Sequence, residues 1–433
     1  MIQSLVSRRY RRLGEVLMAL CVAGGYLSTA ALAQGVPEPP VLSGRATLTI
    51  EEAVDRASSV SPELRSFRSG VDIAQGDVIT SRLPSRFNPG VSLEAGPRLN
   101  TLADASALQF GVTVAQELDR PEKRAAREQV ALLGFQVEQA QLQAARLRLE
   151  LRVRTFYSQF WLSEQLLKLA VEREQLATRS LTALQERYKV GDISLIPVNL
   201  AQVELSVSRA QRERQEGEAA ASRAALLVAV GEPPERSVQP QAALPAAPLE
   251  LPELPRIFQL VIEANPVLLA SETERRRSEA QVQLAQAEAL PNLSPLVSYR
   301  REGPENIVVA GLSVPINLFN RNQGTIFSAE ARRTQTAALR EQRALELRTQ
   351  VEEAYARYNA ARRVLQTYTG DTIAAIERNQ GLVEEGFRAG KTGVTEVLLA
   401  RRDGLNARSA FLQAQADLYT SYVQLQNATG GRL

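Results

Sequence analysis

The sequence predicts a mainly helical fold with a small β part, built from two long helical hairpins and two β-hairpins by internal duplication. Three observations predict this. Two stretches carry heptad-spaced apolar residues over lengths far beyond an ordinary helix, and each stretch ends in a similar glycine turn. A segment of alternating apolar residues, typical of strands, precedes each stretch.

The first 33 residues are predicted to be a secretory signal peptide. Four arginines precede the apolar run from Val16 to Ala23, and Ala31-Leu32-Ala33 provides a small-residue cleavage site. Removal of four arginines and one glutamate brings the 51 basic and 48 acidic residues of the full chain to equal numbers. The remaining chain has no cysteine or histidine, so we expect neither disulfides nor the usual thiolate or imidazole metal sites, and no cofactor.

The first repeat is expected over residues 47–231, after a short linker at 34–46. It begins with a helix from about Ile50 to Ser81. Two strands follow, in the segments VSLEAGPRL and LQFGVTVAQEL, with apolar residues at alternate positions. No segment after the signal approaches the roughly 18 consecutive apolar residues of a spanning helix, so contact with a membrane is expected from these strands.

The long helix of the first repeat is predicted from about Arg124 to Tyr188, a stretch without proline. A helix of about 65 residues would be about 100 Å long, whereas helices of globular proteins usually have about 8 to 20 residues. Its seam alternates steps of four and three through Leu149, Val153, Phe156, Phe160, Ser163, Leu167, Ala170, Glu174, Ala177, Leu181, Leu184 and Tyr188. The pattern predicts a coiled-coil helix, a turn and a shorter returning helix.

A proline-rich connector, residues 232–255, leads to the second repeat at 256–433. Here a helix from Leu254 to Leu290 precedes strands in SPLVSYRRE and IVVAGLSVPINLF. The second long seam passes through Leu347, Val351, Ala354, Tyr358, Ala361, Leu365, Tyr368, Thr372 and Ala375. The returning helix is marked by Leu405, Ser409, Leu412, Ala416, Tyr419 and Val423. The same order of elements therefore occurs twice.

The two long helices end in related turns, ERYKVGDIS from Glu186 and EGFRAGKTG from Glu385. The second contains Gly-Lys-Thr, the end of a phosphate-binding P-loop. Its preceding glycine is one residue too close, however, and a helical pattern replaces the strand that such a loop follows. What the turns share is an aromatic residue, a basic residue and a glycine, as at a helix C-cap. We therefore predict two helical turns and no enzymatic activity.

Four strands with one apolar face cannot close a barrel alone, and an open sheet edge in lipid would leave backbone groups unpaired. Three copies would supply twelve strands. The sequence thus predicts a homotrimer with a 12-stranded transmembrane β-barrel and an α-barrel of long helical hairpins.

Three features together resemble the TolC family of outer-membrane efflux proteins. They are this duplicated layout, the paired turns, and Pro291-Asn292 at the start of the third strand. ELDRPEKR at 117–124 and PINLFNRNQG at 315–324 are similar to the CzcC-like branch, which is associated with heavy-metal cation export. That branch commonly has Leu-Phe-x-Arg-Asn-x-Gly, matched here by Leu318, Phe319, Arg321, Asn322 and Gly324. One departure is Asp-Arg-Pro-Glu-Lys at 119–123, where the branch usually has a Pro-Gly-Lys pattern.

The resemblance implies a duct in the outer membrane, surrounded by its lipid, with helices in the periplasm. Its partners would be a periplasmic membrane-fusion adaptor and an inner-membrane pump of the RND type, and no nucleic acid. The adaptor would dock on the turns, at Tyr188, Lys189, Gly191, Asp192, Phe387, Arg388, Gly390 and Lys391. The Leu-Phe-x-Arg-Asn-x-Gly residues would form the barrel-to-helix junction rather than a binding site.

Alternatives remain open from the sequence. The duct could carry drugs or other small molecules instead of heavy-metal cations. A secreted coiled-coil structural protein would also show heptads, but it has no reason to interrupt them twice with matched amphipathic hairpins. A periplasmic adaptor would have one helical hairpin flanked by β-rich domains.

Overall fold

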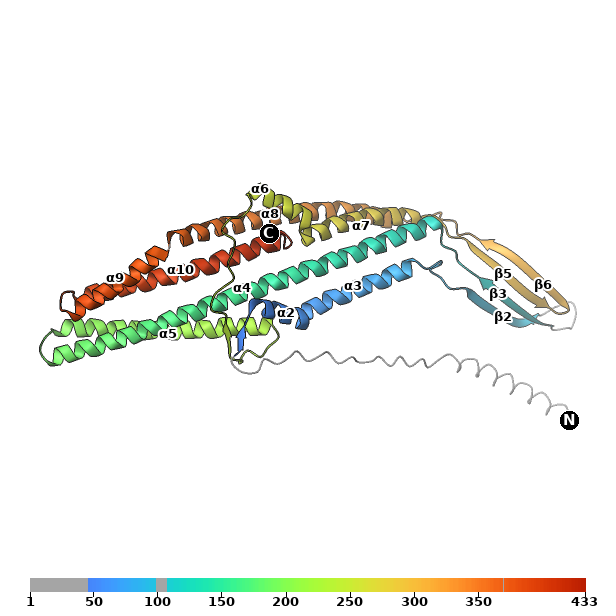
Figure 1. Cartoon of the computed structure of the whole chain (residues 1–433). Helices are drawn as coiled ribbons and strands as arrows, with labels where there is room; N and C mark the ends of the chain where they lie inside the picture. The colour runs from blue at the N-terminus through green and yellow to red at the C-terminus, as the bar shows by residue number, and fades with distance from the viewer. Residues whose placement is uncertain (1–45, 99–106, 369) are drawn as a thin grey trace, which may run out of the picture. The chain divides into compact units, whose positions relative to one another are not determined.

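The computed structural model describes residues 46–98, 107–368 and 370–433, so the predicted signal peptide lies outside it. Figure 1 shows the arrangement of the elements. The helices are α2 (Ile50–Val60), α3 (Pro62–Ser81), α4 (Pro121–Lys189), α5 (Leu195–Ala229), α6 (Leu254–Ala264), α7 (Pro266–Glu288), α8 (Gln323–Thr367), α9 (Gly370–Arg388) and α10 (Val394–Ala428). The strands are β1 (Ala46–Leu48), β2 (Gly90–Arg98), β3 (Ala107–Ala115), β4 (Val238–Pro240), β5 (Ser294–Glu302) and β6 (Glu305–Ser313). Among the described residues, no helix contains a run long and apolar enough to cross a membrane.

The first predicted helix of each repeat is in fact two helices, because a proline interrupts the backbone hydrogen bonds. Ser61 separates α2 from α3, and its hydroxyl accepts a hydrogen bond from the Leu64 N–H at 3.2 Å. Asn265 separates α6 from α7 and caps α7 by accepting from the Val267 N–H at 2.9 Å. The side-chain cap and the following proline start a new helix at equivalent places in both repeats.

The two β-hairpins join into one antiparallel sheet in the order β2-β3-β5-β6. Its register places Leu93, Val112, Tyr299 and Val308 side by side, and Glu94, Gly111, Arg300 and Ile307 in the next row. Because successive residues of a strand point to opposite faces, the first row lies on a mainly apolar face, which also carries Arg301 near the hairpin turns, and the second row lies on the face of Glu94 and Arg300. Strand β6 ends at Ser313, earlier than the predicted strand, which included Pro315. Within the described residues, β2 and β6 are the two edges of the sheet.

Each repeat forms an antiparallel helical hairpin, and the two repeats pack together mainly through α7 and α10, which both contact α4. Helix α5 packs against α4, and α10 packs against α8 and α9 (Figure 1). Helix α10 also contacts α4 of the first repeat. Glycines Gly191, Gly231, Gly390 and Gly430 all have positive φ and end α4, α5, α9 and α10, respectively.

The second long helix is interrupted, where the sequence predicted a continuous one. Helix α4 runs unbroken for 69 residues, whereas α8 ends at Thr367 and α9 begins at Gly370. The second repeat is three residues shorter from the helix start to the tip glycine, Gln323 to Gly390 against Pro121 to Gly191. Removing three residues from a 3.6-residue helix rotates the following apolar face by about 60°. The seam residues Leu365, Tyr368 and Thr372 nevertheless keep their heptad spacing across the interruption.

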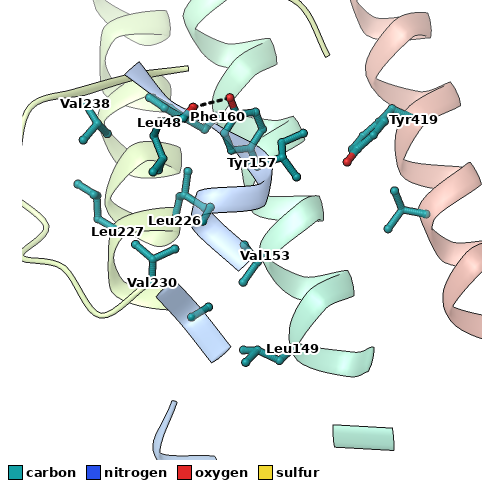
Figure 2. Close-up of a cluster of buried hydrophobic side chains, with 14 of the residues drawn as sticks. Leu48, Leu149, Val153, Tyr157, Phe160, Leu226, Leu227, Val230, Val238 and Tyr419 are labelled. Atoms are coloured by element: carbon teal, nitrogen blue, oxygen red, sulfur yellow. Dashed lines mark hydrogen bonds between the residues drawn. The ribbon is translucent and has the colours of Figure 1, made fainter. Parts of the chain in front are cut away.

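The proline-rich connector is tied to both long helices, and part of it forms a small sheet that the sequence analysis missed. Strand β4 of the connector pairs with β1 in parallel, and both lie over the core cluster around Tyr157 and Phe160 (Figure 2). The Tyr157 hydroxyl donates to the Leu48 carbonyl at 2.7 Å and accepts from the Gln241 N–H at 2.9 Å. In the second repeat, the Tyr358 hydroxyl donates to the connector carbonyl of Pro248.

Candidate functional site

The two tip turns share one backbone geometry, the Schellman motif. After α4, the Gly191 N–H donates to the Tyr188 carbonyl at 2.9 Å, and the Asp192 N–H donates to the Arg187 carbonyl at 2.9 Å. After α9, the Gly390 N–H donates to Phe387 at 3.0 Å, and the Lys391 N–H donates to the Gly386 carbonyl at 2.7 Å. The φ angles are 78° and 72°, which a glycine adopts without a Cβ penalty. The predicted pair of C-cap turns is therefore present.

The first tip exposes apolar side chains between internal ion pairs. Val190 is 79% exposed and Tyr188 is 44% exposed. The Arg187 Nε lies 2.6 Å from the Asp192 Oδ2, and the Lys189 Nζ lies 2.7 Å from the Glu186 carboxylate. Asp192 and Lys189 are thus exposed but already paired within the tip, while Tyr188 and Val190 expose apolar surface to solvent.

The second tip differs, because its aromatic residue packs on the first hairpin. Phe387 is half-buried against a cluster made by the facing sides of α4 and α5, namely Ala177, Leu181, Leu184, Val198, Ala201 and Leu205. The Arg187 guanidinium also lies over its ring, with Cζ 5.5 Å from the centroid. Gly390 and Lys391 are exposed, and the side chain of Arg388 lies outside the described part of the chain.

Arginines of α10 fasten the second hairpin to the first close to the tips. The Arg401 guanidinium pairs with Glu384 of α9 at 2.9 Å and also donates to the Ser180 hydroxyl of α4. Farther from the tips, Arg408 lies 3.4 Å from Glu172 of α4. These contacts bring the two turns together at one end of the helical hairpins.

The residues of the Leu-Phe-x-Arg-Asn-x-Gly motif lie between β6 and the first turn of α8. Asn322 has φ 60° and ψ 19° as the N-cap residue of α8, and its amide donates to the Ala285 carbonyl at the end of α7 at 2.7 Å. Arg321 is exposed, and its backbone N–H donates to the Gln323 side chain at 2.8 Å. Gly324 has no heavy atom within 4 Å of an added Cβ. The motif therefore shapes a connection between the sheet and α8.

Large apolar side chains are exposed around this connection. Phe319 is 93% exposed, Ile316 81% and Phe327 75%, and Leu318 is also exposed. On the first-repeat side, Phe87 is exposed beside the start of β2. The exposed aromatic and aliphatic residues thus adjoin the end of the sheet.

A buried polar network joins the two repeats where the sheet meets α4. The ammonium of Lys123 donates to the Asn292 side-chain carbonyl at 2.7 Å, and the Asn292 amide donates to the Glu117 carboxylate at 2.7 Å. Asp119 accepts from the Arg127 guanidinium at 3.0 Å. Sequence reasoning noticed Pro291-Asn292 and ELDRPEKR separately, but nothing in their spacing showed that they meet.

Burial and charge shift two pKa values in this network. Burial lowers the pKa of the Lys123 ammonium, and the neighbouring carboxylates, first Asp119, oppose the shift only partly. Burial raises the pKa of Asp119, but pairing with Arg127 and the Arg86 N–H outweighs it and leaves the pKa below 3.8. Asp119 is therefore ionised at neutral pH and holds Arg127 in place.

The described residues contain no group of three or more His, Cys, Asp or Glu side chains placed to hold a metal ion. What they present is an amphipathic sheet, a connection rich in exposed apolar residues, and two neighbouring helical tips.

Comparisons with known proteins agree with these features. The chain is 26% identical to the cobalt-zinc-cadmium resistance protein CzcC of Cupriavidus metallidurans, over 88% of this chain and 90% of that protein. It is 28% identical to protein CyaE of Bordetella pertussis, over 98% and 96% of the two chains. The structure of the outer-membrane channel OprN has the same fold, with a TM-score of 0.74 and 20% identity over 88% of this chain and 90% of that one.

The sequence model of one family, described as outer membrane efflux protein, matches residues 53–232 and 257–431. These two segments fall on the two repeats and leave the connector between them. The resemblance inferred from the motifs is confirmed, and the chain belongs to the outer membrane efflux protein family.

Proposed function

We propose that this protein is the outer-membrane duct of a tripartite efflux system, passing heavy-metal cations from an RND-type inner-membrane pump to the cell exterior. The observation that carries the proposal is the four-stranded sheet, with one apolar face and two open edges, continuous with long helical hairpins. A structure of this kind performs no chemistry, and the energy for transport comes from the pump.

Three copies assemble so that β6 of one chain pairs with β2 of the next, giving a closed barrel of twelve strands. Closure satisfies the backbone groups of both edges, which an open sheet in lipid would leave unpaired. The apolar face, with Leu93, Val112, Tyr299 and Val308, then contacts lipid. Phe319 and Phe327 lie at the membrane interface, and the helices extend into the periplasm.

The tips dock onto a periplasmic membrane-fusion adaptor. In support, the turns lie at the far end of α4, about 100 Å of helix away from the sheet. Of the docking residues, Tyr188, Gly191, Gly390 and Lys391 are exposed and available to a partner. Lys189 and Asp192 contribute through the ion pairs that stiffen the first tip, and Phe387 contributes by holding the second tip against it. The helical hairpins that carry the two tips belong to two repeats, which we assign to residues 47–231 and 256–433.

The cargo is inferred from similarity to CzcC, a cobalt-zinc-cadmium resistance protein. With no histidine, and no cysteine beyond the predicted signal peptide, the chain lacks the imidazole and thiolate ligands that usually capture these ions tightly. The polar face of the sheet offers carboxylates, such as Glu94, that bind hydrated cations weakly enough to let them leave.

A deletion strain complemented with the gene tests the proposal. We expect the deletion to sensitise cells to zinc, cobalt, cadmium or copper, and the gene to restore tolerance. The purified protein should bind these ions no better than weakly. Sensitivity to dyes and antibiotics with unchanged metal tolerance would instead assign the duct to drugs or other small molecules. A stable monomer in detergent would contradict the assembly.

A further inference from the structure

The apolar face of the four-stranded sheet carries one small group of polar side chains. Among the side chains that the pairing of the described strands places on the face of Leu93, all are apolar except Tyr299, Arg301 and Asn306. Arg301 stands directly opposite Asn306 across β5 and β6, and Tyr299 lies on the same face of β5, two residues before Arg301. The one charge that these strands place on this face therefore has polar neighbours.

The three side chains present hydrogen-bond donors beside the sheet. The Tyr299 hydroxyl donates to the Asn306 Oδ1 at 2.8 Å, so the oxygen of that amide is used and its nitrogen remains a donor. The Arg301 Nε donates to the Gly303 carbonyl at 3.4 Å, and the other N–H groups of the guanidinium lie on its two terminal nitrogens. Both Arg301 and Asn306 are exposed. Together they offer a cation and an amide donor at one place.

The acidic side chains nearest in sequence lie on the opposite face. Glu302 and Glu305 pair across β5 and β6 next to Arg301 and Asn306, and successive residues of a strand point to opposite sides. The Arg300 guanidinium lies 3.5 Å from the Glu302 carboxylate on that other face. The donors on the apolar face thus have no carboxylate among the described residues of their own face. Arginine and amide donors in such a group suit the oxygens of a phosphoryl anion.

The place of Arg301 along its strand corresponds to the edge of a membrane. Each of the four strands has nine residues and is therefore about 30 Å long at about 3.4 Å per residue. Tilted by about 40°, as in membrane barrels, such a strand rises about 23 Å, close to the roughly 25 Å of the apolar band. Arg301 is the last residue but one of β5, so it lies at the edge of that band, within reach of lipid head groups.

We propose that Arg301 and Asn306 bind a phosphoryl group of a glycolipid in the outer leaflet of the outer membrane. The hairpin turn beside them is at the end of the sheet away from the helices, so it faces the exterior when the helices extend into the periplasm (Figure 1). Phe110, directly opposite Arg301 on β3 and 45% exposed, contacts the acyl chains of the same lipid. The site requires the apolar face in lipid, so it rests on the proposed function.

Titration of the purified protein with bisphosphorylated lipid A tests the site. The protein is stripped of lipid in a neutral detergent, and native mass spectrometry measures the lipid that binds. We expect lipid A to bind more tightly than its dephosphorylated form, and Arg301→Ala to weaken the binding of lipid A at least several-fold. Arg301→Lys should retain part of the affinity, because it keeps the charge without the forked N–H groups. Asn306→Asp should also weaken binding, because its carboxylate repels the phosphoryl group.

The matched control is Arg300→Ala. It removes the same charge from the adjacent residue, which is also exposed but lies on the opposite face of β5. This variant should bind lipid A as the unmodified protein does. Equal losses of affinity in Arg300→Ala and Arg301→Ala would overturn the inference, because the effect would then follow net charge and not the site.

Further outcomes separate a lipid from a free anion, and the lipid site from the proposed function. Inorganic phosphate at the same concentration should leave the thermal midpoint of unfolding unchanged, whereas lipid A should raise it. An equal rise with inorganic phosphate would assign the site to a free anion and overturn the inference. Unweakened binding by Arg301→Ala would also overturn it. If that happens in a protein that is trimeric and restores metal tolerance, the lipid site is wrong and the duct stands.

Discussion

The guanidinium of Arg187 lies over the ring of Phe387, with 5.5 Å between Cζ and the ring centroid, and this contact joins the two tips directly. Arg187 also pairs with Asp192 within its own turn. One side chain therefore stiffens the first turn and anchors the aromatic residue of the second. The tips form one surface rather than two independent hairpin ends.

Replacing Phe387 with alanine should let the second tip move away from the first. The change removes half-buried apolar contact and a cation–π contact, together worth about 1–3 kcal/mol locally. We expect a broader distance distribution between spin labels at V190C and A389C, two exposed tip positions. Phe387→Leu, which keeps apolar bulk, should broaden it less, and an unchanged distribution in the alanine variant would show that other contacts hold the tips together.

Valine at Gly191 or Gly390 should abolish efflux while leaving assembly intact. An added Cβ meets no heavy atom within 4 Å at either position, so the cost is backbone strain at positive φ, about 1–2 kcal/mol and confined to the turn. Metal tolerance and the amount of trimer measure the two effects separately. Gly76→Ala in α3, also without a neighbour within 4 Å, is the control and should leave both unchanged. Normal export by both valine variants would refute docking at the tips.

The glycines that end the returning helices should behave differently, because their surroundings are filled. A Cβ on Gly231 would lie 2.5 Å from the Val60 Cγ2, whereas a Cβ on Gly430 would lie 2.5 Å from the backbone oxygen of Ala264. Alanine at either position should lower the thermal midpoint of unfolding. Val60→Ala should partly rescue Gly231→Ala, since a side chain is the obstacle. The new Cβ of Gly430→Ala would contact backbone atoms, which cannot move aside as a side chain can. If this variant lowered the thermal midpoint no more than Gly231→Ala does, the packing described at the helix ends would be wrong.

Stability should fall at alkaline pH through Tyr157. Burial raises the pKa of its hydroxyl from 10.0 to about 12. Because the folded state resists ionisation that the unfolded chain undergoes, the stabilisation is complete below pH 10 and is lost as the pH rises to about 12. Tyr157→Phe, which removes hydrogen bonds to Leu48 and from Gln241, should be less stable by about 1–3 kcal/mol at pH 8. Denaturant unfolding should show that gap narrowing above pH 10, and a constant gap would contradict the assignment.

The sequence predicted the elements with strong periodicity and missed those that depend on tertiary contacts. The heptad seam of α4 and the glycine turns at Gly191 and Gly390 depend on local pattern, and the structure contains them. The strands β1 and β4 have three residues each, too few for a pattern, and they form because Tyr157 and the core beneath hold them.

In the candidate site, too, some features follow from the local sequence and others depend on tertiary contacts. The backbone of the tips follows from glycine and a helix end. The burial of Phe387 against α4 and α5 does not, because it requires knowing that the second hairpin lies beside the first. The break after Thr367 was also missed, since the spacing of Leu365, Tyr368 and Thr372 continues through it. A heptad pattern gives the side of the helix that is buried, but it does not show that the backbone is continuous.

That break makes the two hairpins mechanically unequal. In α4, each turn is hydrogen-bonded to the next from the sheet to the tip, so a force applied at the first tip is transmitted along one continuous helix. In the second repeat, the helix ends at Thr367 and a new helix begins at Gly370. A force applied at the second tip therefore reaches a break in the helical hydrogen bonds before it reaches the sheet. Of the two hairpins, only the second therefore has a break in the backbone hydrogen bonds between the sheet and its tip, within the part of the chain that the structure describes.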